Sequence, residues 1–131
     1  MPHPWIQFTA LIYASFGILL GLYTFISPIS AALLFGIDLA SPPSNPATPP
    51  FTNNPAIHFV RVFGGRNLAI GLAVFAFYWQ RMPRAIGTLL LCCTACGVVD
   101  TVVTGAWATR GSALVHAVGA GVMGAVGWGM M

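Results

Sequence analysis

The chain has 131 residues, of which 57% are hydrophobic and only 5% are charged. A soluble domain carries about 25% charged residues, so this composition excludes an ordinary water-facing surface and indicates an integral membrane protein. The formal net charge of +3 comes from scattered arginines that form no basic stripe, and we therefore expect no nucleic acid as a partner.

Four segments have the length of about 20 apolar residues that a bilayer crossing needs. They lie at about residues 5–27, 56–79, 84–107 and 112–131. A tryptophan lies near an end of each segment, as an aromatic belt at the membrane surfaces predicts. The predicted fold class is all-α: one transmembrane domain, residues 1–131, that forms an integral membrane four-helix bundle.

The connection between the first two spans, residues 28–55, is much longer than the others. Its first part, ISAALLFGIDLA, is suited to a short helix in the membrane surface, and the prolines of SPPSNPATPPFTNNP exclude regular structure. Long loops of this kind are often lids over functional sites. QRMPR and ATRGS join the later spans, so the second and third spans, and the third and fourth, should be antiparallel neighbours.

Small residues repeat every four positions in two of the spans. The first span has Gly17 and Gly21. The fourth span has a longer row: Ala113, Ala117, Gly121, Ala125 and Gly129. Small residues at this spacing let helix backbones approach closely in lipid, so both rows are predicted helix contacts.

The arginines outside the spans indicate an orientation. Arg81 and Arg84 lie on the side of both termini, and Arg110 lies on the opposite side. Counting positive charges favours cytoplasmic termini, and we expect the endoplasmic reticulum as the membrane. The bilayer is one expected partner, and homo-oligomer formation is left open.

The polar residues inside the spans fall at similar depths. With a rise of about 1.5 Å per residue, Arg61 lies about 7–8 Å and Arg66 about 15 Å from one membrane face. On the same scale Asp100 lies about 10 Å, His116 about 7–8 Å and His58 about 3 Å from that face. The intramembrane carboxylate therefore shares a layer with two arginines, and pairing would lower the cost of about 2.5–3.5 kcal/mol that each charge has at mid-helix.

Several further polar side chains are predicted near this layer. On the third span, Cys93, Cys96, Gly97, Asp100 and Thr104 share one small and polar face. Tyr23 from the first span, Asn67 from the second, and Asp38 from the long loop could approach the same region. Two arginines against Asp100 leave a positive surplus, which invites an anionic or electron-rich ligand group or the second carboxylate of Asp38.

Two interpretations of this cluster compete. An ion pair that only fixes the helix register would need no ligand. An intramembrane ionisable cluster is, however, a functional-site hypothesis by default, and the two histidines at similar depth favour that interpretation. The Cys93-x-x-Cys96 pair raises thiol–disulfide exchange as a further class, although mid-span thiols often pack as small apolar residues. No Cys/His spacing resembles a zinc site, and we expect neither a metal nor a cofactor.

The stretch RVFGGRNLAIGL resembles a family of small four-span membrane proteins of unknown function, mostly fungal. The shared pattern comprises Arg61, Gly64, Gly65, Arg66, Asn67 and Gly71. The resemblance implies an endomembrane protein that handles a hydrophobic small molecule, in the manner of small membrane enzymes of polyketide or terpenoid secondary metabolism that open epoxides or cyclise their substrates.

Two functional hypotheses follow. The first is an intramembrane enzyme that hydrolyses, cyclises or isomerises a lipophilic epoxide or polyene. Its catalytic residues would be Asp100, Arg66, Arg61, His116 and His58. Its substrate-binding residues would be Tyr23, Asn67, Asp38 and Thr104. The alternative is a non-enzymatic structural or carrier-like subunit whose Arg/Asp cluster only holds the bundle together.

Overall fold

A computed structural model describes residues 2–37, 39, 55–107 and 110–131. The helices, in chain order, are α1 (Pro4–Ile26), α2 (Pro28–Leu34), α3 (Pro55–Trp79), α4 (Pro83–Trp107) and α5 (Arg110–Gly129). The four long helices are apolar and long enough to cross a membrane, which confirms the predicted all-α membrane bundle. The bounds differ from the prediction by only one or two residues.

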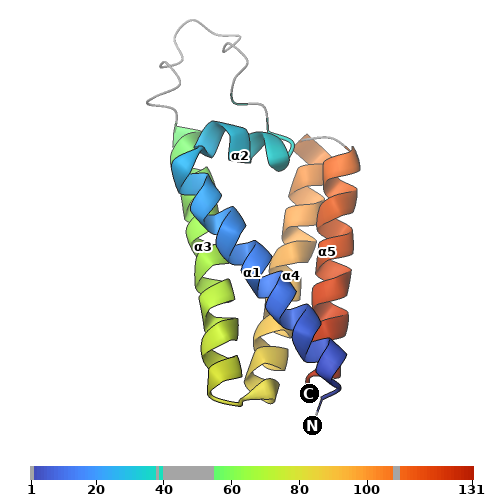
Figure 1. Cartoon of the computed structure of the whole chain (residues 1–131). Helices are drawn as coiled ribbons and strands as arrows, with labels where there is room; N and C mark the ends of the chain where they lie inside the picture. The colour runs from blue at the N-terminus through green and yellow to red at the C-terminus, as the bar shows by residue number, and fades with distance from the viewer. Residues whose placement is uncertain (1, 38, 40–54, 108–109) are drawn as a thin grey trace, which may run out of the picture.

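Proline opens four of these helices, at Pro4, Pro28, Pro55 and Pro83. The first turn of a helix suits proline because its missing N–H has no partner there, and its fixed φ angle is already helical. The predicted first span ends at residue 27, and Pro28 starts α2, the expected short helix. This helix lies across one end of the bundle, and both termini lie at the other end (Figure 1). The rest of the Pro-rich segment, residues 40–54, lies outside the described residues.

The bundle consists of two tightly packed helix pairs. Helix α1 packs along α3 and α4 packs along α5, whereas contacts between α3 and α4 and between α1 and α5 are sparse (Figure 1). Helices α3 and α4 run antiparallel as expected, although they are only loosely packed. Two sides of the bundle are therefore closed, and the other two are open to insertion between helices.

Glycines set the close approach within each pair. A Cβ atom on Gly21 would lie 2.8 Å from the carbonyl oxygen of Gly64, so α1 and α3 touch through their backbones. A Cβ on Gly87 of α4 would similarly lie 2.7 Å from the carbonyl oxygen of Gly127 of α5. Close backbone approach gives the van der Waals packing that holds helices together in lipid. The predicted role of Gly17 and Gly21 is confirmed.

The predicted contact row of α5 is wrong over its middle. Ala117, Gly121 and Ala125 are exposed, and a Cβ on Gly121 would meet nothing within 4 Å. The residues that face α4 are instead Ala120 and Gly127. Helix α5 carries small residues on two of its faces, so their spacing alone does not identify the one that packs.

The apolar core fills only part of the bundle. One buried cluster, which includes Ala14, Val74, Ile86, Leu90 and Met130, joins all four long helices near the end that holds the termini. A smaller cluster lies under α2 and includes Ala31 and Ala32. Along α3, Arg66 lies between Val60 of the smaller cluster and Val74 of the larger one.

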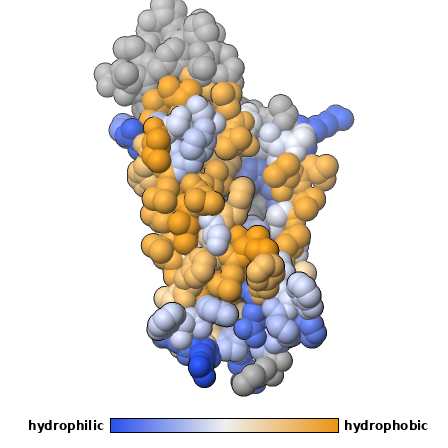
Figure 2. Space-filling view, viewed as in Figure 1, coloured by the Kyte–Doolittle hydropathy of each residue, from blue (hydrophilic) through white to orange (hydrophobic). Residues whose placement is uncertain are grey.

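The outer surface fits a lipid environment. A broad hydrophobic band covers the middle of the helices, and hydrophilic residues gather at the end that holds both termini (Figure 2). Large apolar side chains such as Leu19, Val102 and Val115 are more than half exposed. So large an exposed apolar surface needs a partner, and four membrane-length helices identify that partner as the bilayer.

The turn between α3 and α4 contains a backbone strain that a substitution can test. Arg81 has a φ of 57°, in the left-handed region that favours glycine. We expect Arg81→Gly to raise the free energy of unfolding by about 0.5–1 kcal/mol, because the side chain no longer opposes this conformation. Thermal unfolding in detergent measures the change. Arg84→Gly removes the same charge inside the first turn of α4 and should lower stability by about 0.5–1 kcal/mol; equal shifts for the two variants would contradict the assignment.

Candidate functional site

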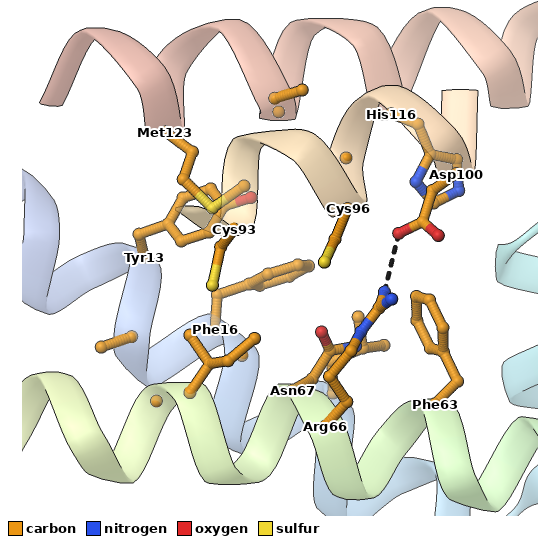
Figure 3. A pocket seen from close by; sticks show the side chains of 18 of the residues that line it. Tyr13, Phe16, Phe63, Arg66, Asn67, Cys93, Cys96, Asp100, His116 and Met123 are labelled. Carbon is orange, nitrogen blue, oxygen red and sulfur yellow. Dashed lines mark hydrogen bonds and ion pairs between the residues drawn. The ribbon is translucent and has the colours of Figure 1, made fainter. Parts of the chain in front are cut away.

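A cavity of about 390 Å³ lies between the two helix pairs. Every helix contributes to its lining, and most of the lining side chains are apolar. The polar members come from four helices and point toward one another in Figure 3: Tyr13, Arg66, Asn67, Cys93, Cys96, Asp100 and His116. A largely apolar cavity with a few convergent polar groups is the usual form of a small-molecule site.

An ion pair connects α3 to α4 at this cavity. The Arg66 Nη2 atom donates a hydrogen bond of 2.7 Å to Oδ2 of Asp100 (Figure 3). The side chains are 36% and 21% exposed, respectively. The prediction from helix depth that Asp100 pairs with an intramembrane arginine is therefore confirmed for Arg66.

The ion pair leaves hydrogen-bonding capacity unused. Within the described part of the chain, the single bond to Arg66 is the only hydrogen bond that Asp100 accepts, although a carboxylate has about four acceptor sites. The Arg66 Nε atom is buried and also lacks a partner among the described residues. Because an unpaired polar group in an apolar interior is costly, the site is suited to a ligand that offers polar atoms to this pair.

Aromatic rings hold the pair in place. The Arg66 guanidinium lies 4.3 Å from the centre of the Phe63 ring, one helical turn earlier on α3. Such a cation–π contact fixes the cation without occupying its N–H groups. The Phe35 ring packs edge-on against Phe63 at 4.6 Å and stacks on the His116 ring at 6.0 Å. These three rings form a wall beside the ion pair.

The end of α2 brings Phe35 to this wall. The Gly36 N–H donates to the carbonyl oxygen of Leu33, and the Ile37 N–H donates to that of Ala32. With Gly36 at a φ of 77°, these bonds form a Schellman motif, which stops the helix and turns the chain. The short helix of the long connection therefore supplies a side chain to the site.

A second cavity of about 290 Å³ lies beside the first. Four residues line both cavities: Phe35, Phe63, Asp100 and His116. Thr104, which we predicted as a substrate-binding residue, lines the second cavity. The predicted polar face of α4 is thereby confirmed, with Cys93, Cys96 and Gly97 at the first cavity and Thr104 at the second.

Three predicted site residues lie elsewhere. Arg61, His58 and Tyr23 are exposed and line neither cavity, so their predicted roles at the site are corrected. The reason is helix rotation: residues five apart on a helix differ by about 140°, so Arg61 turns outward when Arg66 faces α4. On α1, Thr24 is fully buried, which directs the adjacent Tyr23 away from the bundle. Asp38 lies outside the described residues.

Two important lining residues were missed by the sequence analysis. Phe63 precedes Arg66 by three positions, a spacing that places side chains on the same helix face. Tyr13 lies two turns before Leu20 on the face of α1 that also carries Phe16 and Gly17. Phe63 is apolar and therefore gave no signal as a buried polar residue. Tyr13 lies about 15 Å from Tyr23 along its span, outside the predicted polar layer.

The side chains place limits on metal binding. Across the described ranges, no group of three His, Cys, Asp or Glu side chains could hold a metal ion. The three cysteines carry free thiols, and two of them, Cys93 and Cys96, line the first cavity. Asp100, Arg66 and His116 are the ionisable side chains with nitrogen or carboxylate groups that line this cavity among the described residues.

The chain belongs to a family of unknown function, described as domain of unknown function (DUF4267), whose model matches residues 14–130. The match covers α2, α3, α4 and α5, α1 from Ala14 onward, and every lining residue named above except Tyr13. No curated protein and no solved structure matches the chain at a significant level.

Proposed function

We propose that this member of the DUF4267 family is an intramembrane enzyme that acts on a lipophilic small molecule, with epoxide opening, by hydrolysis or cyclisation, as the reaction class. The observation that carries the proposal is the hydrogen-bonded Arg66–Asp100 pair at the wall of a largely apolar cavity of about 390 Å³. An apolar cavity between membrane helices is accessible to substrates that partition into lipid. The ion pair supplies the acid–base and charge-stabilising groups.

The roles of the residues follow from their chemistry. In hydrolysis, Asp100 accepts a proton from water as the water oxygen attacks one epoxide carbon. The bond between the other carbon and the ring oxygen stays intact, while the attacked C–O bond breaks and leaves an alkoxide. Arg66 stabilises this negative charge, and the alkoxide then takes the proton held by Asp100, so that epoxide and water give a diol. His116 lines the same cavity and would relay protons, and Asn67 would orient the substrate.

In cyclisation, a hydroxyl group of the substrate replaces water as the nucleophile. Asp100 then accepts the hydroxyl proton, and the reaction forms an ether ring and an alcohol with the same total atoms as the substrate. Isomerisation of a polyene would use Asp100 as the base that removes one proton and returns it at another carbon. The three reactions share the same groups because each needs a proton acceptor beside a cation.

The cellular setting is part of the proposal. We propose the endoplasmic reticulum membrane with cytoplasmic termini, and biosynthesis of polyketide or terpenoid metabolites as the pathway class. The exposed Arg81 and Arg84 at the end that holds both termini support this orientation.

A turnover assay tests the enzyme proposal. We expect wild-type protein in lipid nanodiscs to convert lipophilic epoxides, and Asp100→Asn and Arg66→Ala to lower kcat at least about 100-fold, the lower range for a general acid–base group. Arg61→Ala is the matched control, because Arg61 is exposed and lines neither cavity. Equal turnover by Asp100→Asn and wild type would refute the assignment of Asp100.

One observation favours a second candidate, the non-enzymatic subunit. The Arg66–Asp100 bond joins two helix pairs that otherwise touch sparsely, so the pair could serve only to hold them together. This candidate predicts that the wild type shows no turnover, and that Arg66 and Asp100 variants lose stability while any ligand binding stays intact.

A further inference from the structure

The ion pair lies at the junction of two cavities. Asp100, His116, Phe35 and Phe63 line both of them, whereas Arg66 lines the larger one. Apart from these shared residues, the smaller cavity is lined mainly by apolar side chains: Ile37, Leu39, Ala56, Phe59, Val60 and Val103. The larger cavity is also mostly apolar. Apolar space therefore extends from the charged groups in two directions.

The cavities reach the outside through different sides of the bundle. The larger cavity includes Phe16 of α1 and Val115 of α5, which are 63% and 71% exposed. The smaller cavity includes Phe59 of α3 and Val103 of α4, which are 74% and 53% exposed. These are the two sides where helix contacts are sparse, α1 to α5 and α3 to α4. All four residues are apolar and belong to membrane-spanning helices, with Phe59 and Val103 about one turn from the helix ends near α2. We therefore expect both openings to face the apolar part of the bilayer.

We propose that the two cavities are the two lobes of one binding site, and that the ligand is an elongated lipophile whose oxygen function lies within its chain, with hydrocarbon on both sides. The inference rests on the proposed function and adds the substrate class. The oxygen lies at the Arg66–Asp100 pair, one hydrocarbon arm occupies each lobe, and Phe35 borders the passage between them.

Energetics in a membrane favour this arrangement. A ligand that comes from lipid gains little from apolar burial alone, because lipid tails are as apolar as the cavity. Its affinity comes from the oxygen at the ion pair, and from dispersion contacts in lobes that would otherwise be empty. An oxygen at the end of a chain can reach the ion pair but leaves one lobe unfilled.

Two alcohols of equal carbon number, dodecan-6-ol and dodecan-1-ol, test the inference as unreactive binding probes. Affinity is measured from the rise of the unfolding temperature with ligand concentration in detergent. We expect wild-type protein to bind dodecan-6-ol about tenfold more tightly, a difference of about 1.4 kcal/mol.

Neighbouring residues provide matched variants. Val103→Trp fills the smaller lobe, whereas Val102→Trp adds the same side chain at a position that is 67% exposed and lines neither cavity. We expect Val103→Trp to weaken dodecan-6-ol binding about tenfold and to leave dodecan-1-ol binding unchanged. Val115→Trp at the larger lobe should weaken both probes relative to Leu114→Trp, which also lines neither cavity.

The outcomes separate this inference from the proposed function. Equal binding of both alcohols by wild type, or of dodecan-6-ol by the Val103→Trp and Val102→Trp variants, overturns the two-lobed site. If the two-lobed site is overturned in this way but Asp100→Asn still abolishes epoxide turnover, the enzyme proposal stands without the two-lobed site. If neither alcohol raises the unfolding temperature of the wild type, the two-lobed site is overturned, and turnover alone then decides the enzyme proposal.

Discussion

Replacing both members of the ion pair with apolar residues is expected to give a stable but inactive protein. Asp100→Leu alone leaves the Arg66 cation inside the bundle without its carboxylate partner. Arg66→Met alone leaves the Asp100 carboxylate without its cation. Each single variant should lose about 2–3 kcal/mol of unfolding free energy, below the range for fully buried pairs because both side chains are partly exposed. The double variant contains neither charge and should recover at least wild-type stability.

The same three variants should all lack turnover. The double variant is the most informative, because we expect it to be at least as stable as the wild type and yet to lack turnover. Unfolding in detergent gives the stability, and epoxide conversion in nanodiscs gives the activity.

The double variant also distinguishes the two candidate functions. If the pair serves only to hold the helix pairs together, its removal loses a stabilising bond, and the double variant should be less stable than wild type. If the pair is retained for chemistry, stability does not require it. A double variant that is as unstable as the single variants would contradict the enzyme interpretation of the pair.

Two features could be predicted from the sequence: the positions of the helices, and Asp100 as the partner of an intramembrane arginine. A strong physical signal marks each of them. Apolar runs of membrane length have few alternatives to a spanning helix, and prolines mark the starts of most helices. The cost of an unpaired charge in lipid, combined with a fixed rise per residue, was sufficient to bring Asp100 into the layer of Arg66.

The rotation of α3 about its axis could not be predicted in the same way. Arg61 and Arg66 are the same residue type at similar depths, so neither depth nor charge selects the inward one. The rotation of α3 is set by Gly64, which contacts α1. Arg66 lies about 200° round from Gly64 and therefore faces α4, whereas Arg61 remains near the outer edge of the contact with α1.

The tilt of α1 brings Tyr13, rather than a residue near the other end of the helix, next to α5. A Cβ atom added to Gly119 of α5 would lie 3.6 Å from the Tyr13 hydroxyl oxygen. A Cβ atom added to Gly129 would lie 2.9 Å from the Ile6 side chain. The first half of α1 thus contacts α5, and the second half diverges toward α3 (Figure 1). Depth counting gives the level of a residue but not the rotation of its helix. It therefore included Tyr23, which lies near the level of Gly64 but on the exposed face of α1.

Gly64→Ala is expected to be the most damaging single-methyl substitution in the bundle. A Cβ at this position would overlap the Thr24 side chain and lie 2.6 Å from its Cβ atom. Thr24 is fully buried, and its hydroxyl donates a 2.6 Å hydrogen bond to the Gly21 carbonyl oxygen, so it has no room to rotate away. We expect a loss of about 2–3 kcal/mol in unfolding free energy, even after the gain of about 0.8–1 kcal/mol in helix propensity.

Gly65→Ala is the control, because it adds the same methyl group one residue later on the same helix. Its Cβ would meet only Phe25, at an ordinary contact distance of 3.9 Å, so the helix-propensity gain should remain and stability should rise by up to about 1 kcal/mol. Because α1 and α3 both line the larger cavity, separating them at Gly64 should also lower turnover, whereas Gly65→Ala should preserve it. Similar unfolding free energies for the two variants would show that α1 and α3 do not approach as closely as their glycines indicate, and the position of Arg66 opposite Asp100 would then need another cause.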